Sequence, residues 1–220
     1  MLDERVSVQN TIVDFVDRLS CACALEDTFN PWRDVCELDA EPSLAPGKRA
    51  LRLQQHLTRD ARYILVGEAP GYQGCRYSGI AFTSEYLLIE GAIPGVSLKN
   101  RITSRTRAMK EPSATMVWDT LYRLDIADHT VLWNAFPFHP SKPKTTLSNR
   151  PPSAEELHFG RPVLEELLSF YRTPTVIAVG KNAAKSLEEG GIPHKAVRHP
   201  SMAGKPEFVK GMTSIIGRNL

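Results

Sequence analysis

The chain has 220 residues, of which 42% are hydrophobic and 24% charged, and this balance is typical of one globular α/β domain with a sizeable core. No apolar run approaches the roughly 20 residues of a membrane span, and the polar start lacks the apolar core of a signal peptide. We therefore expect one domain over residues 1–220, in the cytoplasm and without a membrane partner. The net charge of +2 excludes a uniformly basic surface but is compatible with a local basic groove.

The first part of the chain predicts two helices joined by a long connection. Apolar residues recur at helical spacing over 6–19. Residues 27–47 lose this periodicity and gather prolines, so we expect a long surface connection there. A short helix is expected over 48–58.

Four short apolar runs predict buried strands at 62–66, 130–135, 175–179 and 195–198. Helical patterns lie between them, and strands that alternate with helices form a parallel sheet covered on both faces. The predicted fold class is therefore α/β, with three layers around a central four-stranded parallel sheet. The helices expected after the first strand lie at 84–91, 115–124, from 153 onward, 182–189 and 207–216.

One of these helices carries conflicting signals. Ser153 and Glu156 form a capping box, which begins a helix. Gly160 and Pro162 follow, and proline both lacks a backbone donor and clashes with the preceding turn. We therefore expect a kink or a split in this helix.

Unusual residues follow three of the predicted strands, at Gly67–Gly71, Asn134–Pro140 and His199–Ser201. In open parallel sheets, ligands bind beyond the carboxyl ends of the strands. The three segments therefore predict one ligand site.

The first of these segments, Gly67-Glu68-Ala69-Pro70-Gly71, is a tight loop. It lacks the Gly-Lys-Ser/Thr ending of a phosphate-binding P-loop and the G-x-G-x-x-G spacing of a dinucleotide site. Its small residues instead allow main-chain groups to approach a planar ligand closely.

Three side chains near the strand ends suit a nucleobase. The ring of Phe82 can stack on a base. The amide of Asn134 offers a donor beside an acceptor, which matches O4 and N3–H of uracil but not the reversed pair of cytosine. An N–H of His199 can stabilise the charge that develops on uracil O2 when the N-glycosidic bond breaks. Each residue also has a structural interpretation, as a core phenylalanine, a capping asparagine and a structural histidine.

Taken together and in this order, the loop 67–71, Phe82, Asn134 and His199-Pro200-Ser201 resemble the motifs of the uracil-DNA glycosylase superfamily, and the first and last most resemble its family 4 branch. The resemblance spans about residues 60–210 in layout, although only the short motifs are specific. It implies an enzyme that hydrolyses the N-glycosidic bond of uracil, or of a related deaminated or 5-substituted base, in DNA during base excision repair.

The resemblance also implies a role for each motif residue. The loop residues Gly67, Ala69, Pro70 and Gly71 would bind the flipped base and its sugar, Phe82 would stack on the base, and Asn134 would bind its edge. His199 would hydrogen-bond O2 of the leaving base, Ser201 would bind a phosphate, and Met202 would be the wedge that replaces the flipped nucleotide in the stack.

Two departures from the family bear on its chemistry. Some branches hold Asp or Asn where this chain has Ala69, which cannot activate water, so Glu68 is the nearest carboxylate and the second candidate catalytic residue beside His199. Branches strict for uracil hold a bulky aromatic residue where this chain has Gly71, although Tyr72 could refill that space. We therefore expect a dissociative path centred on His199 and a tolerance for other bases.

The chain has four cysteines, Cys21, Cys23, Cys36 and Cys75. They do not match the cluster-binding spacing of family 4, and they lack the close C-x-x-C pairs of zinc ribbons. We therefore predict no metal site and no cofactor.

Basic residues gather in two segments near the predicted site and are candidates for DNA contact, single- or double-stranded. Arg105 and Lys142 are the two that we single out, and a monomer is expected. The full set is Lys99, Arg101, Arg105, Arg107, Lys110, Lys142, Lys144 and Arg150.

Three alternatives stay open at this point. The first is a catalytically silent protein of the same fold that binds damaged or single-stranded DNA. The second is an enzyme that hydrolyses free nucleosides, and the third is a redox or metal protein that uses the cysteines.

Overall fold

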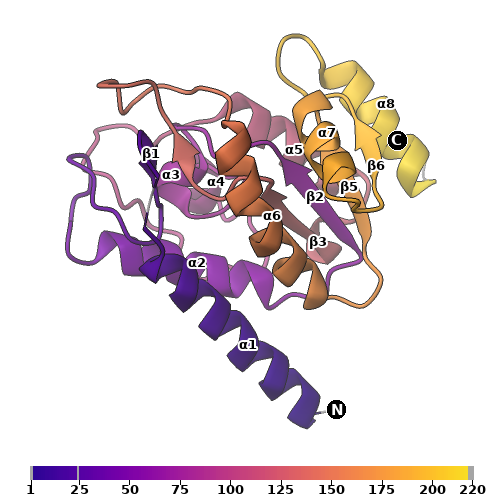
Figure 1. The fold of residues 1–220 in the computed structure, drawn as a ribbon, viewed down its shortest axis with the longest axis horizontal. Coiled ribbons are helices and arrows are strands. Elements are labelled where there is room, and N and C mark those ends of the chain that lie inside the picture. Colours follow the sequence, from indigo (N-terminus) through magenta and orange to yellow (C-terminus); the bar gives the residue numbers. More distant parts are fainter. Residues whose placement is uncertain (1, 24, 218–220) are drawn as a thin grey trace.

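The computed structural model describes residues 2–23 and 25–217, and its side chains are described from residue 9 on. Its main sheet has four parallel strands in the order β3-β2-β5-β6 (Figure 1), which confirms the predicted fold class. The strands are β2 (Tyr63–Gly67), β3 (Thr130–Asn134), β5 (Thr175–Val179) and β6 (Lys195–Val197).

Alternate residues of the central strand β2 face two separate hydrophobic clusters, as the two-residue period of a strand requires. Ile64 and Val66 belong to one cluster and Leu65 to the other. The first cluster is completed by α1 (Leu2–Cys21), α2 (Ala45–Leu57), α6 (Ala154–Ser169) and α7 (Lys181–Glu189). The second is completed by α4 (Glu85–Ile89), α5 (Pro112–Arg123) and α8 (Lys205–Ile216), so the molecule has three layers.

The connection predicted over 27–47 is not confined to the surface. Trp32 is only 3% exposed, and its ring stacks on that of Trp133 at a centroid distance of 5.9 Å. The same segment contributes β1 (Thr28–Phe29), which pairs antiparallel with β4 (His139–Pro140). The sequence did not predict this burial, because its prolines and lack of periodicity describe only the local chain and not contacts with distant residues.

The split expected in α6 is wrong, since one helix runs through Gly160 and Pro162, while a kink at Pro162 stays a prediction. The capping box of Ser153 and Glu156 begins it as predicted. Pro162 is exposed and removes one hydrogen bond, while Leu164 and Leu167 remain packed in the core. Gly160 is needed because a Cβ there would collide with the carbonyl oxygen of Ala135.

The remaining differences are small. The helix predicted over 115–124 begins at Pro112, and the last helix begins at Lys205 rather than at residue 207. Two short elements were not predicted, α3 (Cys75–Ser78) and the 3₁₀ turn η1 (Ala127–His129). Over the residues that the structure describes, no helix combines the length and apolarity of a membrane span.

Candidate active site

A cavity of about 300 Å³ lies at the carboxyl edge of the sheet, and each of the four strands contributes to it through its last residue or through the residues that follow it. Residues singled out from the sequence form half of its lining, namely Glu68, Ala69, Pro70, Gly71, Phe82, Asn134 and His199. The rest of the lining was missed by the sequence analysis and consists of Glu111, Val179, Gly180, Lys181, Asn182, Ala183 and Arg198. Tyr72 is not among the lining residues in the described part of the chain.

Gly67 lies directly beneath two of the cavity side chains. It ends β2 and is in register with Asn134 of β3. A Cβ at Gly67 would lie 2.6 Å from Oδ1 of Asn134 and 2.7 Å from Cζ of Phe82. Glycine is therefore required here because Asn134 and Phe82 occupy the space of a side chain.

Phe82 belongs to the core and to the cavity at once. It is 7% exposed and packs in the same cluster as Trp118. Its φ of 47° lies in the left-handed region, which is uncommon outside glycine, and Nε1 of Trp118 donates to its carbonyl oxygen at 3.0 Å. This conformation places one edge of the ring at Gly67 and the ring centroid 6.1 Å from that of His199.

Asn134 is 5% exposed and reaches the cavity from the end of β3. Within the described residues, its side-chain amide forms no hydrogen bond. An amide that is nearly buried and unpaired retains both its donor and its acceptor for a ligand.

The hydrogen bonds of His199 determine which of its ring nitrogens carries the proton. The backbone N–H of Ser201 donates to Nδ1 at 3.2 Å, and Oγ of Ser201 lies 2.7 Å from the same nitrogen. Because a backbone N–H can only donate, Nδ1 accepts, and the proton of the neutral ring is on Nε2. Burial, together with the charge of Arg198, lowers the pKa of His199. The ring is therefore neutral at physiological pH, with one N–H available at Nε2.

The segment after β5 brings α7 to the wall of the cavity. Gly180 has φ 97°, a conformation that favours glycine, and a Cβ there would lie 3.2 Å from Cβ of His199. Lys181 and Asn182 follow and line the cavity. The rule that ligands bind at the carboxyl ends of strands could have found these residues, because they follow the predicted strand 175–179.

Glu68 joins two walls of the cavity. Its Oε1 accepts a hydrogen bond of 2.8 Å from Nδ2 of Asn182, so its carboxylate links the loop after β2 to the start of α7. Through this contact, Glu68 positions the loop against α7. A direct catalytic role for Glu68 stays a prediction.

Glu111 is the lining residue that sequence reasoning had least chance of finding. It precedes α5, at the end of a segment without periodicity, and no motif includes it. Its carboxylate occupies the space beside Gly74, where a Cβ would collide with Oε2. Burial raises the pKa of Glu111, and a hydrogen bond from the Ser113 hydroxyl to Oε1, at 2.7 Å, opposes that shift.

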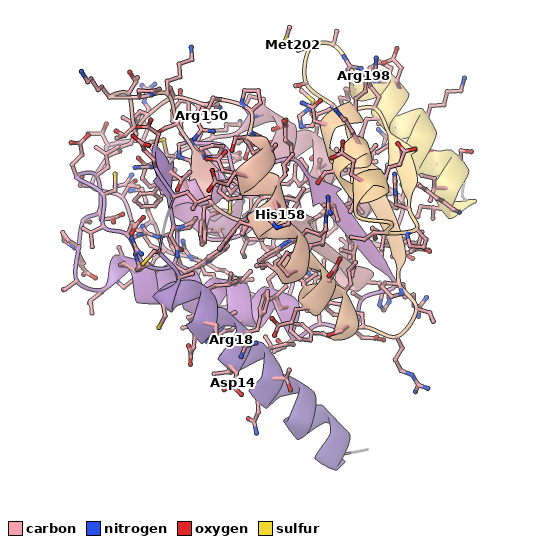
Figure 2. All side chains as sticks on the ribbon, in the orientation of Figure 1. Asp14, Arg18, Arg150, His158, Arg198 and Met202 are labelled. Atoms are coloured by element: carbon pink, nitrogen blue, oxygen red, sulfur yellow. The ribbon has the colours of Figure 1, made fainter. Side chains whose placement is uncertain are left out.

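The predicted DNA contacts lie outside the cavity lining. The hydroxyl of Ser201 is beside His199, and its contact with a phosphate stays a prediction. Met202 is 87% exposed and, with Ala203, adopts left-handed backbone angles, φ 53° and 59°. Figure 2 shows Met202 at the tip of the loop that projects above Arg198, between β6 and α8.

The basic segment 98–110 is anchored to the core by Glu85. Its buried carboxylate accepts hydrogen bonds from the backbone N–H groups of Ile102 and Thr103, at 2.8 and 2.9 Å, and from the Thr103 hydroxyl at 2.7 Å. Arg101 donates to backbone carbonyl oxygens of the same segment. A buried acidic residue therefore holds this basic loop in one shape.

Arg150 is also engaged within the protein. It pairs with Glu156 at 2.7 Å, near the start of α6 (Figure 2), and donates to the carbonyl oxygen of Ser141. The exposed cations that remain in the two basic segments include Arg105, Arg107, Lys142 and Lys144.

The cysteines are divided between the surface and the interior. Cys21 and Cys23 are exposed, whereas Cys36 and Cys75 are buried. The described residues contain no group of three or more His, Cys, Asp or Glu side chains that could hold a metal ion.

A family model and a solved structure match this chain. The model of the uracil DNA glycosylase superfamily matches residues 54–213, well over half of the chain. Among solved structures, the chain is similar to wild-type SMUG2 of Pedobacter heparinus, with a TM-score of 0.62 and 15% identity over 94% of this chain and 97% of that one. At this identity the similarity concerns the fold alone. No curated protein matches the chain.

Proposed function

The chain belongs to the uracil-DNA glycosylase superfamily, and on that premise we propose that it hydrolyses the N-glycosidic bond of uracil, or of a related deaminated or 5-substituted base, in DNA. One observation carries this proposal: an unpaired amide and a neutral histidine line the same cavity, at Asn134 and His199. Asn134 would bind O4 and N3–H of the base, and Phe82 would stack on its face.

The reaction would follow a dissociative path. The bond between C1′ and the base nitrogen breaks first, and its electron pair leaves with the base. Nε2–H of His199 then stabilises the charge on O2, as an oxyanion hole does. Neutral histidine suits this role because the lowered pKa of His199 keeps Nδ1 unprotonated and bound to Ser201.

The range of bases would depend on Gly71. A Cβ at this position would make ordinary contacts, 3.6 Å from Oε1 of Glu111 and 4.0 Å from Nδ2 of Asn149, and glycine places no bulky side chain at this part of the cavity wall. We infer that a 5-substituent on the pyrimidine is tolerated. The cations Lys181 and Arg198 in the same wall would attract the phosphates that flank a flipped nucleotide.

The deciding experiment is an incision assay. We expect the purified protein to release base from oligonucleotides that carry uracil, and the panel adds hypoxanthine, xanthine and hydroxymethyluracil in single- and double-stranded form. Binding of these oligonucleotides without release of any base would favour the catalytically silent binder. Hydrolysis of free deoxyuridine, without activity on DNA, would favour a nucleoside hydrolase.

DNA contact would come from the exposed cations of the two basic segments. We expect the combined Arg105→Gln and Lys142→Gln variant to bind uracil-containing duplex more weakly at low salt and with a weaker salt dependence. The slope of log affinity against log salt should fall by about 0.9 for each phosphate that the variant no longer neutralises. Arg150→Gln is unsuitable as a control because Arg150 pairs with the buried Glu156. Lys185→Gln on α7 is suitable, since it removes an exposed charge outside these segments whose pairing with Glu189 is long and solvent-exposed. An unchanged slope would remove both residues from the DNA-binding surface.

A further inference from the structure

The cavity contains a carboxylate that the dissociative path centred on His199 does not use. Ala69 cannot activate water, and the carboxylate of Glu68 is bound by Asn182. Glu111 lines the same cavity as Asn134 and His199, although it is far from both in the sequence and lies at the end of the irregular segment that precedes α5. A chain that hydrolyses a glycosidic bond must place water at C1′, so an unassigned carboxylate in the cavity is a candidate to hold it.

The surroundings of Glu111 show that its position is specified. Its carboxylate lies against the loop between Gly71 and Gly74, where Gly74 leaves the space that Oε2 occupies. The Ser113 hydroxyl donates to Oε1 at 2.7 Å. No cation pairs with Glu111 among the described residues. The Ser113 hydroxyl and the space left at Gly74 thus fix the position of the carboxylate, and Oε2 can still accept a hydrogen bond.

We propose that Glu111 is the general base of the reaction and accepts the proton of the water that attacks C1′. This inference rests on the proposed function. Once the bond to the base has broken and its electron pair has left with the base, the water oxygen forms a bond to C1′. The water loses one proton to the Glu111 carboxylate, which passes it to the released base anion or to solvent, so that sugar hydroxyl and neutral base are the products.

The environment of Glu111 favours this chemistry. Burial raises the pKa of its carboxyl, and a base whose pKa approaches the working pH is more effective than an ordinary carboxylate. Negative charge near C1′ also stabilises the oxocarbenium-like sugar. The carboxylate must be ionised to act, so activity should fall as the pH decreases through the raised pKa of Glu111.

Other groups near Glu111 could influence this pH dependence. From α3, the Cys75 thiol lies close, but burial raises the pKa of Cys75 so far that it remains neutral. The Asn149 amide, which like Glu111 lies near Gly71, carries no charge. The charged or titratable groups that share the cavity are Glu68, Lys181, Arg198 and His199.

The test is single-turnover excision by Glu111→Gln on the best oligonucleotide of the panel. We expect a rate about 10²–10⁴-fold below that of the wild type, with unchanged affinity for the DNA and the acidic limb of the wild-type pH profile altered. Glutamine keeps the size of the side chain and an acceptor for Ser113, so folding should be retained. Glu188→Gln, an exposed glutamate on α7, is the matched control and should keep the wild-type rate.

A second variant separates proton transfer from a structural role. Ser113→Ala removes the hydrogen bond that lowers the pKa of Glu111, so the acidic limb should move to higher pH while the rate on the plateau is nearly retained. An excision rate of Glu111→Gln within a few-fold of the wild type, or an acidic limb that Ser113→Ala does not move, would overturn the inference and leave the proposed function intact. A wild-type protein that releases no base from any oligonucleotide would overturn both.

Discussion

Replacement of His199 by alanine is expected to slow single-turnover excision by about 10²–10³-fold, the usual cost of removing one donor to a developing oxyanion. The reason is that Nε2–H of His199 is the only donor of this ring that Ser201 leaves available. The measurement is the rate of base release at saturating enzyme, because it reports the chemical step without product release.

The control for this variant is His158→Ala. His158 is exposed on α6 (Figure 2) and is not among the described residues that line the cavity, so its removal should leave the rate unchanged. Near-normal excision by His199→Ala, in a protein that remains folded, would refute the assigned role. Protonation of Nδ1 should also impair His199, but only at low pH, because burial lowers its pKa.

Replacement of Asn134 by alanine is expected to lower kcat/KM for uracil by about 10²–10⁴-fold. Two groups of the base, O4 and N3–H, would lose their partners in a desolvated site, at a cost of ~1–3 kcal/mol each, and each 1.36 kcal/mol corresponds to a factor of ten in rate. The measurement is kcat/KM of variant and wild type on uracil-containing DNA, together with the affinity of each for DNA that carries an abasic site. Because abasic DNA lacks the base, the variant and the wild type should bind it equally well.

Asn10→Ala removes an exposed amide on α1 and is the matched control. The thermal stability of the Asn134→Ala variant is a further check. Because the nearly buried amide forms no hydrogen bond with the described residues, its loss should change the melting temperature little. A large fall in stability with unchanged specificity would mean that Asn134 has a structural role, as a capping asparagine would.

The family and the fold class could be predicted because the signals are local. A buried parallel strand appears as a short β-branched run, and the loop that follows must contain small residues where backbone approaches ligand. The motif at Gly67–Gly71, with Asn134 and His199, therefore predicted the superfamily that the family model confirms. The split expected in α6 was wrong because tertiary packing on Leu164 and Leu167 outweighed the local preference of Gly160 and Pro162.

Contacts between distant segments could not be predicted in the same way. Glu111 reaches the cavity only because Gly74 leaves space for its carboxylate, and neither residue indicates the other in the sequence. The stacking of Trp32 on Trp133 and the anchoring of segment 98–110 by Glu85 are of the same kind. Each depends on long-range packing, which a pattern of spacing along the chain does not encode.

The sequence by itself determined the parallel α/β architecture, the superfamily and half of the cavity lining, because strand periodicity and short motifs are properties of neighbouring residues. The tertiary structure alone decided that Phe82 belongs to both the core and the cavity lining and that Ser201 sets the tautomer of His199. It also decided that Glu111 lines the same cavity as these residues. These features depend on which groups meet across the carboxyl edge of the sheet. That meeting is fixed by packing at distances of a few ångströms, which only the folded chain defines.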